Sequence, residues 1–204
     1  MYELYASEES ASDIIRGLLD EIGVPYKIHP ISLAAGDQRR PEFLALNPVG
    51  RIPVLVDDGF VIFETAAIVL YLLDKHPLAG LAPALDTPER GTFYQWLVYM
   101  TNTLQPAYSR MYFPRRFTAA QDQAQGVRDQ VDTDLAGIWQ IIDDVLADHG
   151  PFMMGEQFSA LDIYLLIMAS WHLPEGSIAK KYPNVQRCIE RLGDRPALKD
   201  LVDI

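Results

Sequence analysis

The sequence predicts a small α/β domain followed by an all-helical domain, and three observations support this fold class. Residues 1–75 alternate short β-rich runs with helical patterns in the order βαβαββα, which implies a mixed sheet with helices packed on it. Residues 76–88 have the proline- and glycine-containing composition of a linker. Beyond them, the apolar patterns all have helical spacing. We therefore expect two domains, over residues 1–80 and 88–204.

The elements of the first domain follow from residue types and spacing. Four strands are predicted from β-rich runs, at residues 4–6, 25–29, 52–56 and 60–63. The segment Asp57-Asp58-Gly59 separates the last two runs, which indicates a hairpin. Three helices are predicted, at residues 12–22, 41–46 and 64–75, and Gly23 is a common terminator for the first.

The second domain is predicted from apolar faces with helical spacing. These faces lie at residues 93–104, 127–145, 163–171, 185–192 and 197–202. Ser159 and Asp162 have the spacing of a capping box, with Asp in place of the usual Glu. We assign Asp162 a structural role, because loss of such a cap costs about 1 kcal/mol or more. Cys188 lies on an apolar helix face and is interpreted as a buried structural thiol.

Composition and charge exclude several classes of function. The 204 residues include 28 acidic and 17 basic side chains, for a net charge of −11. This acidity disfavours binding to nucleic acids and to anionic membranes. The longest apolar run, residues 66–73, is far too short to span a membrane, and the N-terminus lacks the pattern of a signal peptide.

Cysteine and histidine usage bears on whether the chain holds a disulfide framework or a metal site. A single cysteine, Cys188, rules out an intramolecular disulfide and a cysteine-based zinc site. The four histidines show no metal-ligand spacing, so we expect no metal. This usage is typical of a reducing cytoplasm, which is the expected location.

Several segments, in order along the chain, resemble the cytosolic glutathione S-transferases. Residues 47–55 (NPVGRIPVL) are similar to the NPxGKVPVL signature of that family, and residues 64–68 (ETAAI) to its ESxAI motif. Residues 155–162 (GEQFSALD) and 195–197 (RPA) resemble segments of its C-terminal domain. The resemblance implies a thioredoxin-like N-terminal domain, an all-helical C-terminal domain, glutathione as co-substrate and a cytosolic homodimer.

The resemblance also implies a glutathione site. In the family the proline matching Pro53 follows a cis peptide bond, and the residue before it, here Ile52, offers its backbone to the cysteinyl part of glutathione. Glu64 and Thr65 match the residues that receive the γ-glutamyl end, and Arg51 is placed to meet the glycyl carboxylate. The alternative for Pro53 is an ordinary edge-strand proline, that for Glu64 and Thr65 is a helix cap, and that for Arg51 is a solvated surface charge.

The start of the first helix is where the glutathione thiol should be activated. A free thiol with a pKa of about 8.5 is mostly protonated at neutral pH, and a hydroxyl donor or a helix N-terminus lowers that value. Ser10 resembles the catalytic serine of the theta- and zeta-like branches, although a shift of one residue places Glu9 there. Ser12 is the alternative, or an N-cap. The branch with a catalytic cysteine is excluded, and Glu8, Glu9 and Asp13 oppose ionisation unless they point away.

Five polar or aromatic residues are candidates for the second-substrate pocket, each with bundle core as the alternative: Tyr99, Asn102, Gln105, Tyr108 and Tyr112. The segment from Tyr112 to Arg116 is an aromatic–basic cluster at a helix end. The leading function is glutathione S-transferase acting on a small apolar electrophile. The rivals are a glutathione-dependent disulfide reductase or peroxidase, and a non-catalytic binding or regulatory protein of the same fold.

Overall fold

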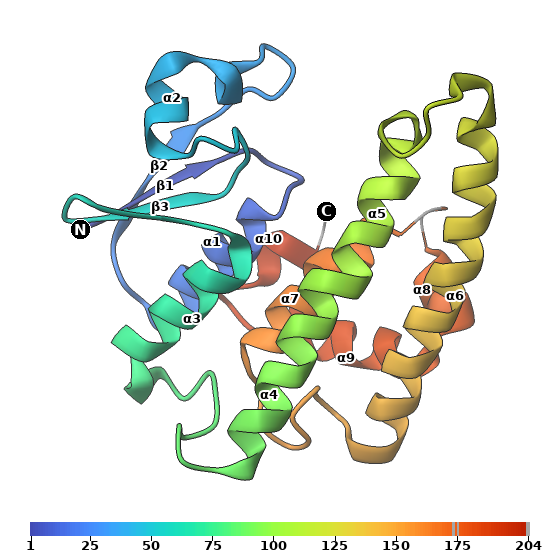
Figure 1. Cartoon of the computed structure of the whole chain (residues 1–204). Helices are drawn as coiled ribbons and strands as arrows, with labels where there is room; N and C mark the ends of the chain where they lie inside the picture. Colours follow the sequence, from blue (N-terminus) through green and yellow to red (C-terminus); the bar gives the residue numbers. More distant parts are fainter. Residues whose placement is uncertain (173, 175, 203–204) are drawn as a thin grey trace.

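A four-stranded mixed sheet forms the first half of the chain (Figure 1). The computed structural model describes residues 1–202 except 173 and 175. The strand order is β2-β1-β3-β4. β1 (Tyr2–Ala6) pairs in parallel with β2 (Tyr26–Pro30) and antiparallel with β3 (Val54–Asp57), which pairs antiparallel with β4 (Phe60–Phe63). The predicted mixed sheet is confirmed.

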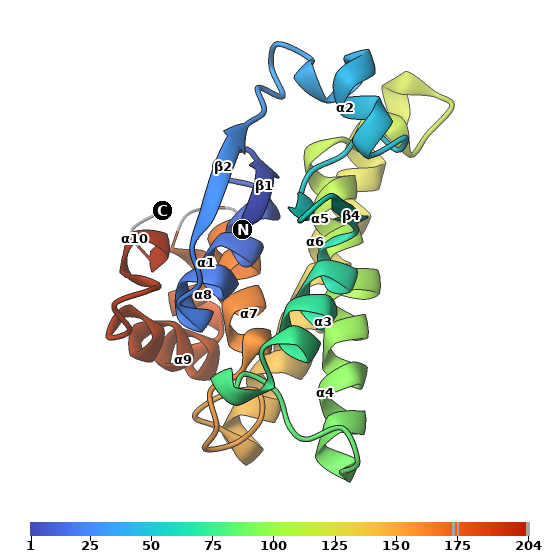
Figure 2. The same cartoon turned by 90° about the vertical axis from the view of Figure 1, so that its left-hand side faces the viewer.

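Three α-helices pack on this sheet. α1 (Ser12–Ile22) and α3 (Thr65–Lys75) lie on one side, and α2 (Pro41–Leu46) lies on the other (Figures 1 and 2). α1 is amphipathic and ends at Gly23, whose φ of 77° suits a left-handed C-cap. The hairpin between β3 and β4 turns through Asp58 and Gly59, both with positive φ, as a two-residue type I′ turn requires.

The second half is helical. Its α-helices are α4 (Pro88–Tyr99), α5 (Gln105–Tyr112), α6 (Ala124–His149), α7 (Ala160–Ser170), α8 (Ser177–Lys181), α9 (Pro183–Gly193) and α10 (Lys199–Val202). Short 3-10 turns occur at Asp37–Arg39, Pro77–Ala79, Pro114–Arg116 and Gln121–Gln123. None of the described helices is both long and apolar enough to cross a membrane.

A π-helical segment, Met100–Leu104, joins α4 to α5 where the sequence predicted a regular helix. Pro106 stands in the first turn of α5. Proline has no backbone N–H, and its ring clashes with the carbonyl four residues earlier. A wider turn just before the proline therefore lets the helix continue along its length.

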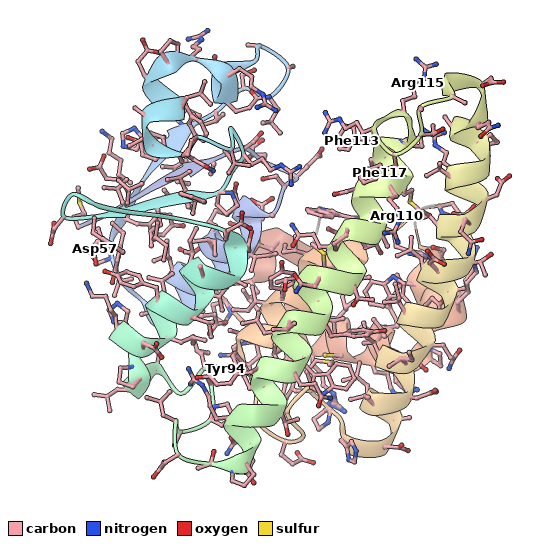
Figure 3. All side chains as sticks on the ribbon, in the orientation of Figure 1. Asp57, Tyr94, Arg110, Phe113, Arg115 and Phe117 are labelled. Atoms are coloured by element: carbon pink, nitrogen blue, oxygen red, sulfur yellow. The ribbon has the colours of Figure 1, made fainter. Side chains whose placement is uncertain are left out.

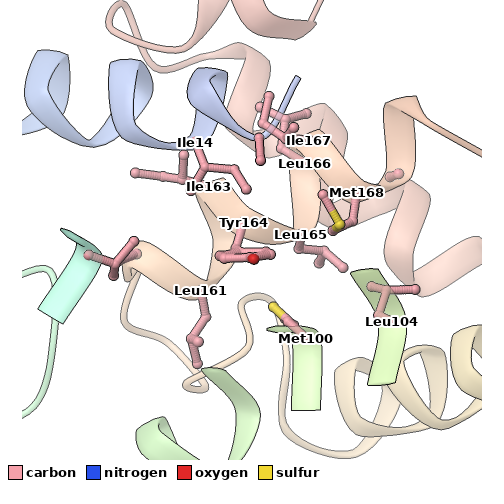
Figure 4. Packing of buried hydrophobic residues seen from close by; sticks show 14 of the residues in the cluster. Ile14, Met100, Leu104, Leu161, Ile163, Tyr164, Leu165, Leu166, Ile167 and Met168 are labelled. Atoms are coloured by element: carbon pink, nitrogen blue, oxygen red, sulfur yellow. The ribbon is translucent and has the colours of Figure 1, made fainter. Parts of the chain in front are cut away.

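α7 is the centre of the core. Every residue from Ala160 to Ala169 is buried, and neighbouring elements surround the helix (Figure 4). Its N-terminus has the predicted capping box between Ser159 and Asp162. The Asp162 carboxylate also accepts the backbone N–H of Met153 at 2.8 Å, so a fully buried charged group has its hydrogen bonds satisfied.

Two of the contacts that hold the sheet half against the helical half involve α1. Gly17 of α1 leaves no room for a side chain, since an added Cβ would lie 2.8 Å from Leu201 Cδ1 and 3.0 Å from Ile163 Cγ2. Arg195 of the RPA segment makes a two-pronged ion pair with Glu21 of α1, at 2.7 and 2.6 Å. Because α1 is fixed in this way, the turn that precedes it is also fixed relative to the second half.

Candidate functional site

The backbone of Ile52 is the centre of the candidate site. The Ile52–Pro53 peptide bond is cis, as the resemblance implied. Among the described residues, nothing hydrogen-bonds to the N–H or C=O of Ile52. Both groups are thus available to an extended ligand, which could add to the sheet in the manner of a further strand.

The register of the sheet places the other candidate segments beside this backbone. Val54 pairs with Tyr5 on one side and with Phe63 on the other. Pro53 directly precedes Val54 and therefore lies between the end of β1 and the end of β4. The chain continues from β1 to Ser10 and from β4 to Glu64. Three chain segments far apart in sequence meet at one end of the sheet.

Asn47 holds the loop that precedes Ile52. It is 2% exposed, donates from Nδ2 to the carbonyl of Arg51 at 2.7 Å and accepts the N–H of Val49 at 3.0 Å. Gly50 has a φ of 65°, and a Cβ there would lie 2.9 Å from the carbonyl oxygen of Gln38. The loop is therefore held by a buried amide and by a close backbone approach that only glycine allows.

Glu64 and Thr65 form the N-terminus of α3. Glu64 has a φ of 74°, a conformation that costs a non-glycine residue about 1–3 kcal/mol and is common at functional sites. Its exposed carboxylate takes part in no ion pair with any described side chain. Thr65 is 7% exposed, and in the part of the chain that the structure describes its hydroxyl has no hydrogen-bond partner. A carboxylate, a free hydroxyl and helix N-terminal N–H groups suit a ligand carrying both an ammonium and a carboxylate.

Arg51 is exposed and likewise forms no ion pair with any residue described by the structure. Its backbone carbonyl is occupied by Asn47, but its guanidinium is directed by no internal contact. The side chain is therefore free to meet an anionic group that approaches along the loop.

The turn before α1 presents Ser10 and buries Ser12. The Ser10 hydroxyl donates to the carbonyl oxygen of Ser7 at 2.6 Å and accepts the N–H of Ser12 at 3.1 Å. Ser10 is partly exposed, whereas Ser12 is 1% exposed. Ser12 is also not the N-cap, because the helix begins at Ser12 and Ala11 precedes it. Of the two candidate hydroxyls, that of Ser10 is the one a ligand can reach.

The nearby carboxylates differ in where they point. Asp13 is 4% exposed and accepts the backbone N–H of Ser10 at 3.2 Å, while Arg16 lies 3.6 Å away. Burial raises the pKa of Asp13, and these backbone and arginine contacts partly oppose that shift. Glu8 and Glu9 are exposed to solvent. Asp13 is thus engaged with the backbone of the turn, and Glu8 and Glu9 are screened by water.

The structure gives the five predicted pocket residues different surroundings. Tyr108 is 1% exposed, accepts the Trp139 indole N–H at 2.9 Å and hydrogen-bonds to His172 at 3.1 Å. It is a core residue, because its hydroxyl is fully used inside the bundle. Gln105 accepts a hydrogen bond from the hydroxyl of Tyr164 on α7, so its side chain faces that helix.

Of the other three predicted pocket residues, Tyr112 stacks beside Tyr108 with ring centres 6.5 Å apart, and Tyr99 and Asn102 have other surroundings. Tyr99 is partly buried at the end of α4 and packs edge-on against Trp96. Asn102 borders a cleft of about 430 Å³ between the π-helical segment and α6. Tyr112 borders a second cleft, of about 470 Å³, at the tip of α5 and α6. Its hydroxyl donates to the carbonyl of Trp171 at 2.5 Å.

No group of three or more His, Cys, Asp or Glu side chains within the described ranges is arranged to hold a metal ion. Cys188 is 1% exposed, as predicted. Burial, with the nearby Asp162 carboxylate, raises the pKa of its thiol well above the usual value. The residues of this chain that meet at the sheet end therefore offer hydrogen-bond donors and a carboxylate, not a cysteine nucleophile.

Comparison with known proteins decides the family. Residues 3–74 match the family model described as glutathione S-transferase, N-terminal domain, and residues 103–202 match glutathione S-transferase, C-terminal domain. The chain belongs to the glutathione S-transferase family. The thioredoxin-like sheet half and the helical half expected from the sequence are thereby confirmed.

Individual glutathione S-transferases and relatives support the same assignment. The chain is 30% identical to the disulfide-bond oxidoreductase YfcG of Escherichia coli, over 97% of this chain and 92% of that protein. It is 31% identical to glutathione S-transferase D7 of Drosophila melanogaster, over 88% and 78%. A glutathione transferase homologue from Sulfitobacter, solved with glutathione bound, superposes with a TM-score of 0.88 at 27% identity, covering 100% of this chain and 97% of that one.

Some contributors to the site were not predicted. Asn47 was part of a recognised motif but had no assigned role, although an Asn before a tight turn is a known signal for side chain–backbone hydrogen bonding. The Ser7 carbonyl that holds the Ser10 hydroxyl carries no sequence signal, because any residue has that carbonyl. Both depend on the folded loop.

Proposed function

We propose that this transferase-family chain binds glutathione at the end of the sheet and joins the glutathione sulfur to a small apolar electrophile, so that the product is a thioether of glutathione. The observation that carries the proposal is the unpaired backbone of Ile52, flanked by the Ser10 turn on one side and by Glu64 and Thr65 on the other. The Sulfitobacter homologue with glutathione bound supports this ligand.

Each part of glutathione has a suitable partner in this arrangement. The cysteinyl backbone would pair with the N–H and C=O of Ile52. The γ-glutamyl ammonium would meet the Glu64 carboxylate, and the adjacent carboxylate would meet the Thr65 hydroxyl and the N-terminus of α3. Arg51 would meet the glycyl carboxylate. Placed in this way, the thiol would point toward Ser10.

The Ser10 hydroxyl would stabilise the thiolate by exchanging its acceptor. It has one proton, which it donates to the Ser7 carbonyl at 2.6 Å, and the Ser12 hydroxyl oxygen lies 3.0 Å from the Ser10 hydroxyl oxygen. A thiolate is a charged acceptor and therefore a stronger one than a neutral carbonyl, so the hydroxyl would turn toward the sulfur. The thiol proton leaves to solvent, the sulfur bonds to the electrophilic carbon, and the leaving group departs with its electron pair.

A second candidate is glutathione-dependent disulfide reduction, which the similarity to YfcG favours. In that reaction a glutathione thiolate attacks a disulfide, one thiol leaves, and a second glutathione resolves the mixed disulfide. The products are two thiols and oxidised glutathione. This route uses the same thiolate and needs no enzyme cysteine.

We propose a homodimer in the cytoplasm, as the resemblance implied. The supporting observations are the family membership itself and the cysteine usage of the chain.

Calorimetric titration with glutathione tests the site. We expect micromolar to millimolar binding that is lost in Glu64→Ala and retained in the matched control Glu156→Ala, since Glu156 is exposed and remote in sequence from the site. A pH titration of the bound thiol by ultraviolet absorbance should give a higher thiol pKa in Ser10→Ala than in wild type. Product analysis then separates a thioether from oxidised glutathione.

Each negative result has a definite meaning. Absence of binding at several millimolar glutathione would refute both enzyme candidates. Binding with a thiol pKa equal to that of free glutathione would indicate a non-catalytic binding protein of the same fold.

A further inference from the structure

The spacing Ser-x-x-Asp occurs at two helix starts in this chain, and the proposed function uses only the serine of one of them. Residues 159–162 (SALD) form the capping box of α7, and residues 10–13 (SASD) have the same spacing at the start of α1. In a capping box the serine and the acidic residue each satisfy a backbone N–H of the other end of the motif. Since the second motif contains Ser10, its acidic member, Asp13, bears on the thiol chemistry.

Ser10 and Asp13 are joined by reciprocal hydrogen bonds. The Ser10 N–H donates to Asp13 Oδ2 at 3.2 Å, and the Asp13 N–H donates to the Ser10 carbonyl oxygen at 3.0 Å. The Ser10 hydroxyl accepts the N–H of Ser12 at 3.1 Å. Asp13 is 4% exposed, so its hydrogen bonds are largely shielded from water and are stronger for it. Asp13 thus ties Ser10 to the first turn of α1.

The two motifs differ in where the serine hydroxyl donates. The Ser159 hydroxyl donates to Asp162 Oδ2 at 3.1 Å, and both residues are at most 2% exposed. The Ser10 hydroxyl instead donates to the Ser7 carbonyl oxygen at 2.6 Å, and Ser10 is partly exposed. Asp13 therefore fixes Ser10 through its backbone and leaves the hydroxyl proton able to turn toward a ligand.

Four aspartates are buried in the part of the chain that the structure describes, and the other three hold regions away from the Ser10 turn. Asp57 binds two side chains of α3 at the opposite end of the sheet (Figure 3). Asp143 accepts backbone N–H groups at the start of α9, and Asp162 caps α7. Of these buried carboxylates, that of Asp13 is the one bonded to the candidate site.

The Asp13 carboxylate also places a negative charge near the expected position of the sulfur. Its ionisation is influenced by Arg16, which lies 3.6 Å away on α1, and by Glu8 of the preceding turn. Burial raises the pKa of Asp13, and the Ser10 N–H and Arg16 partly oppose that shift. A negative charge about 8 Å from a thiol, one hydrogen bond beyond each side of Ser10, raises the thiol pKa by about 0.4–1.5 for effective dielectric constants of about 80 to 20.

We propose that Asp13 is a positioning residue for the glutathione thiol, holding the Ser10 turn so that the serine hydroxyl donates to the sulfur. This inference rests on the proposed function and goes beyond it, because Asp13 acts through Ser10 and not by contact with the ligand. The same carboxylate has an opposing electrostatic effect, since its charge disfavours the thiolate. Asp13→Asn keeps an acceptor for the Ser10 N–H and removes the charge, whereas Asp13→Ala removes both.

The thiol pKa of bound glutathione, followed by ultraviolet absorbance, separates the two effects. The Ser10 increment is the rise in this pKa that Ser10→Ala causes in a given background. Asp13→Asn should lower the thiol pKa by about 0.4–1.5 and leave the Ser10 increment as in wild type. Asp13→Ala should reduce the increment to about half or less, because the hydroxyl is no longer held and the two residues are coupled.

A matched control and two further measurements keep other failures apart. Asp20→Asn is the same substitution two turns along α1, where Asp20 is exposed and accepts the Tyr26 hydroxyl at 2.9 Å; it should change neither the thiol pKa nor the Ser10 increment. Thermal unfolding establishes that each variant is folded. If Asp13→Ala is not, Asp13→Leu takes its place, because leucine fills the buried space without an acceptor. Calorimetric glutathione affinity should stay close to wild type in the Asp13 variants.

The outcomes that contradict the inference are distinct from those that contradict the proposed function. An unchanged Ser10 increment in folded Asp13→Ala or Asp13→Leu, with glutathione bound, would overturn the positioning role and leave the proposed function standing. A thiol pKa in Asp13→Asn equal to that of wild type would overturn the electrostatic effect. A Ser10 increment of zero in wild type would overturn both the inference and the proposed role of Ser10.

Discussion

Gly17 is the position at which one added methyl group should most directly disturb the packing of α1. It lies in the middle of the helix, where Gly→Ala normally stabilises by about 0.5–1 kcal/mol. Here the new Cβ would lie 2.8 Å from Leu201 Cδ1, 3.0 Å from Ile163 Cγ2 and 3.1 Å from Leu198 Cδ2. Ordinary van der Waals contacts begin near 3.4 Å, so all three neighbours must move.

The expected change in stability follows from comparing the gain in helix propensity with the cost of the close contacts at the added Cβ. The neighbours are at most 1% exposed, so they cannot relax into solvent. Overpacking of a tight core costs about 1–3 kcal/mol, which exceeds the gain in helix propensity. We expect Gly17→Ala to lower the free energy of unfolding by about 1–2 kcal/mol. Gly91→Ala on α4, where nothing lies within 4 Å of the added Cβ, should raise it.

Urea denaturation of the two variants gives the measurement. A double variant adds a sharper test: Gly17→Ala should cost less in a Leu201→Ala background, with a coupling of about 0.5 kcal/mol or more. If Gly17→Ala stabilises the chain as much as Gly91→Ala, or if the coupling is zero, the argument that α1 is locked against Leu201 is refuted. Because α1 follows the Ser10 turn, Gly17→Ala should also weaken glutathione binding.

Three further predictions concern buried polar groups. Burial raises the pKa of Asp162 from 3.8 to about 6, so the folded state binds the carboxyl proton more tightly than the unfolded state does. Protonation of Asp162 therefore stabilises the fold fully below about pH 4. This stabilisation, about 3 kcal/mol, is lost as the pH rises through 6. The free energy of unfolding of Asp162→Asn, measured by denaturation at pH 4 and pH 7, should not show this loss. A loss of the same size in the variant would contradict the assignment of the pH dependence to Asp162. Arg195→Ala leaves Glu21, whose side chain is 8% exposed, without its ion-pair partner. Chemical denaturation should show a loss of about 1–3 kcal/mol in the free energy of unfolding. An unchanged midpoint would show that the ion pair is dispensable. Tyr108→Phe leaves the Trp139 N–H unpaired in the core and should lower the free energy of unfolding by about 1–3 kcal/mol. Glutathione binding should be retained. A loss of glutathione binding at unchanged stability would instead place Tyr108 at the site.

The elements of the fold were largely predictable because their signals are local. Residues 12–22, 41–46 and 60–63 have the same bounds in the structure as predicted, and the other strands shift by one or two residues. The strong signals were apolar spacing, a terminating glycine and a two-residue hairpin turn. The π-helical segment and α8 were missed, because the first depends on how a proline is accommodated and the second is only five residues long.

The candidate site was predictable in part. Motif spacing picked out Ile52, Pro53, Glu64 and Thr65, and the sheet register places these segments side by side. The choice between Ser10 and Ser12 was open, because adjacent serines look alike in sequence and only the turn buries one of them. Tyr108 was equally ambiguous, since an aromatic residue on a helix suits both a pocket and a core.

The sequence by itself determined the order of the elements, the capping box at Ser159 and Asp162, and the family motifs, because each depends on residues close together along the chain. Only the tertiary structure decided which backbone groups of Ile52 remain unpaired and that the Asp13 carboxylate is buried beside the Ser10 turn. Those facts depend on which residues meet when distant segments pack. Packing is set by the whole core at once, which no local pattern encodes.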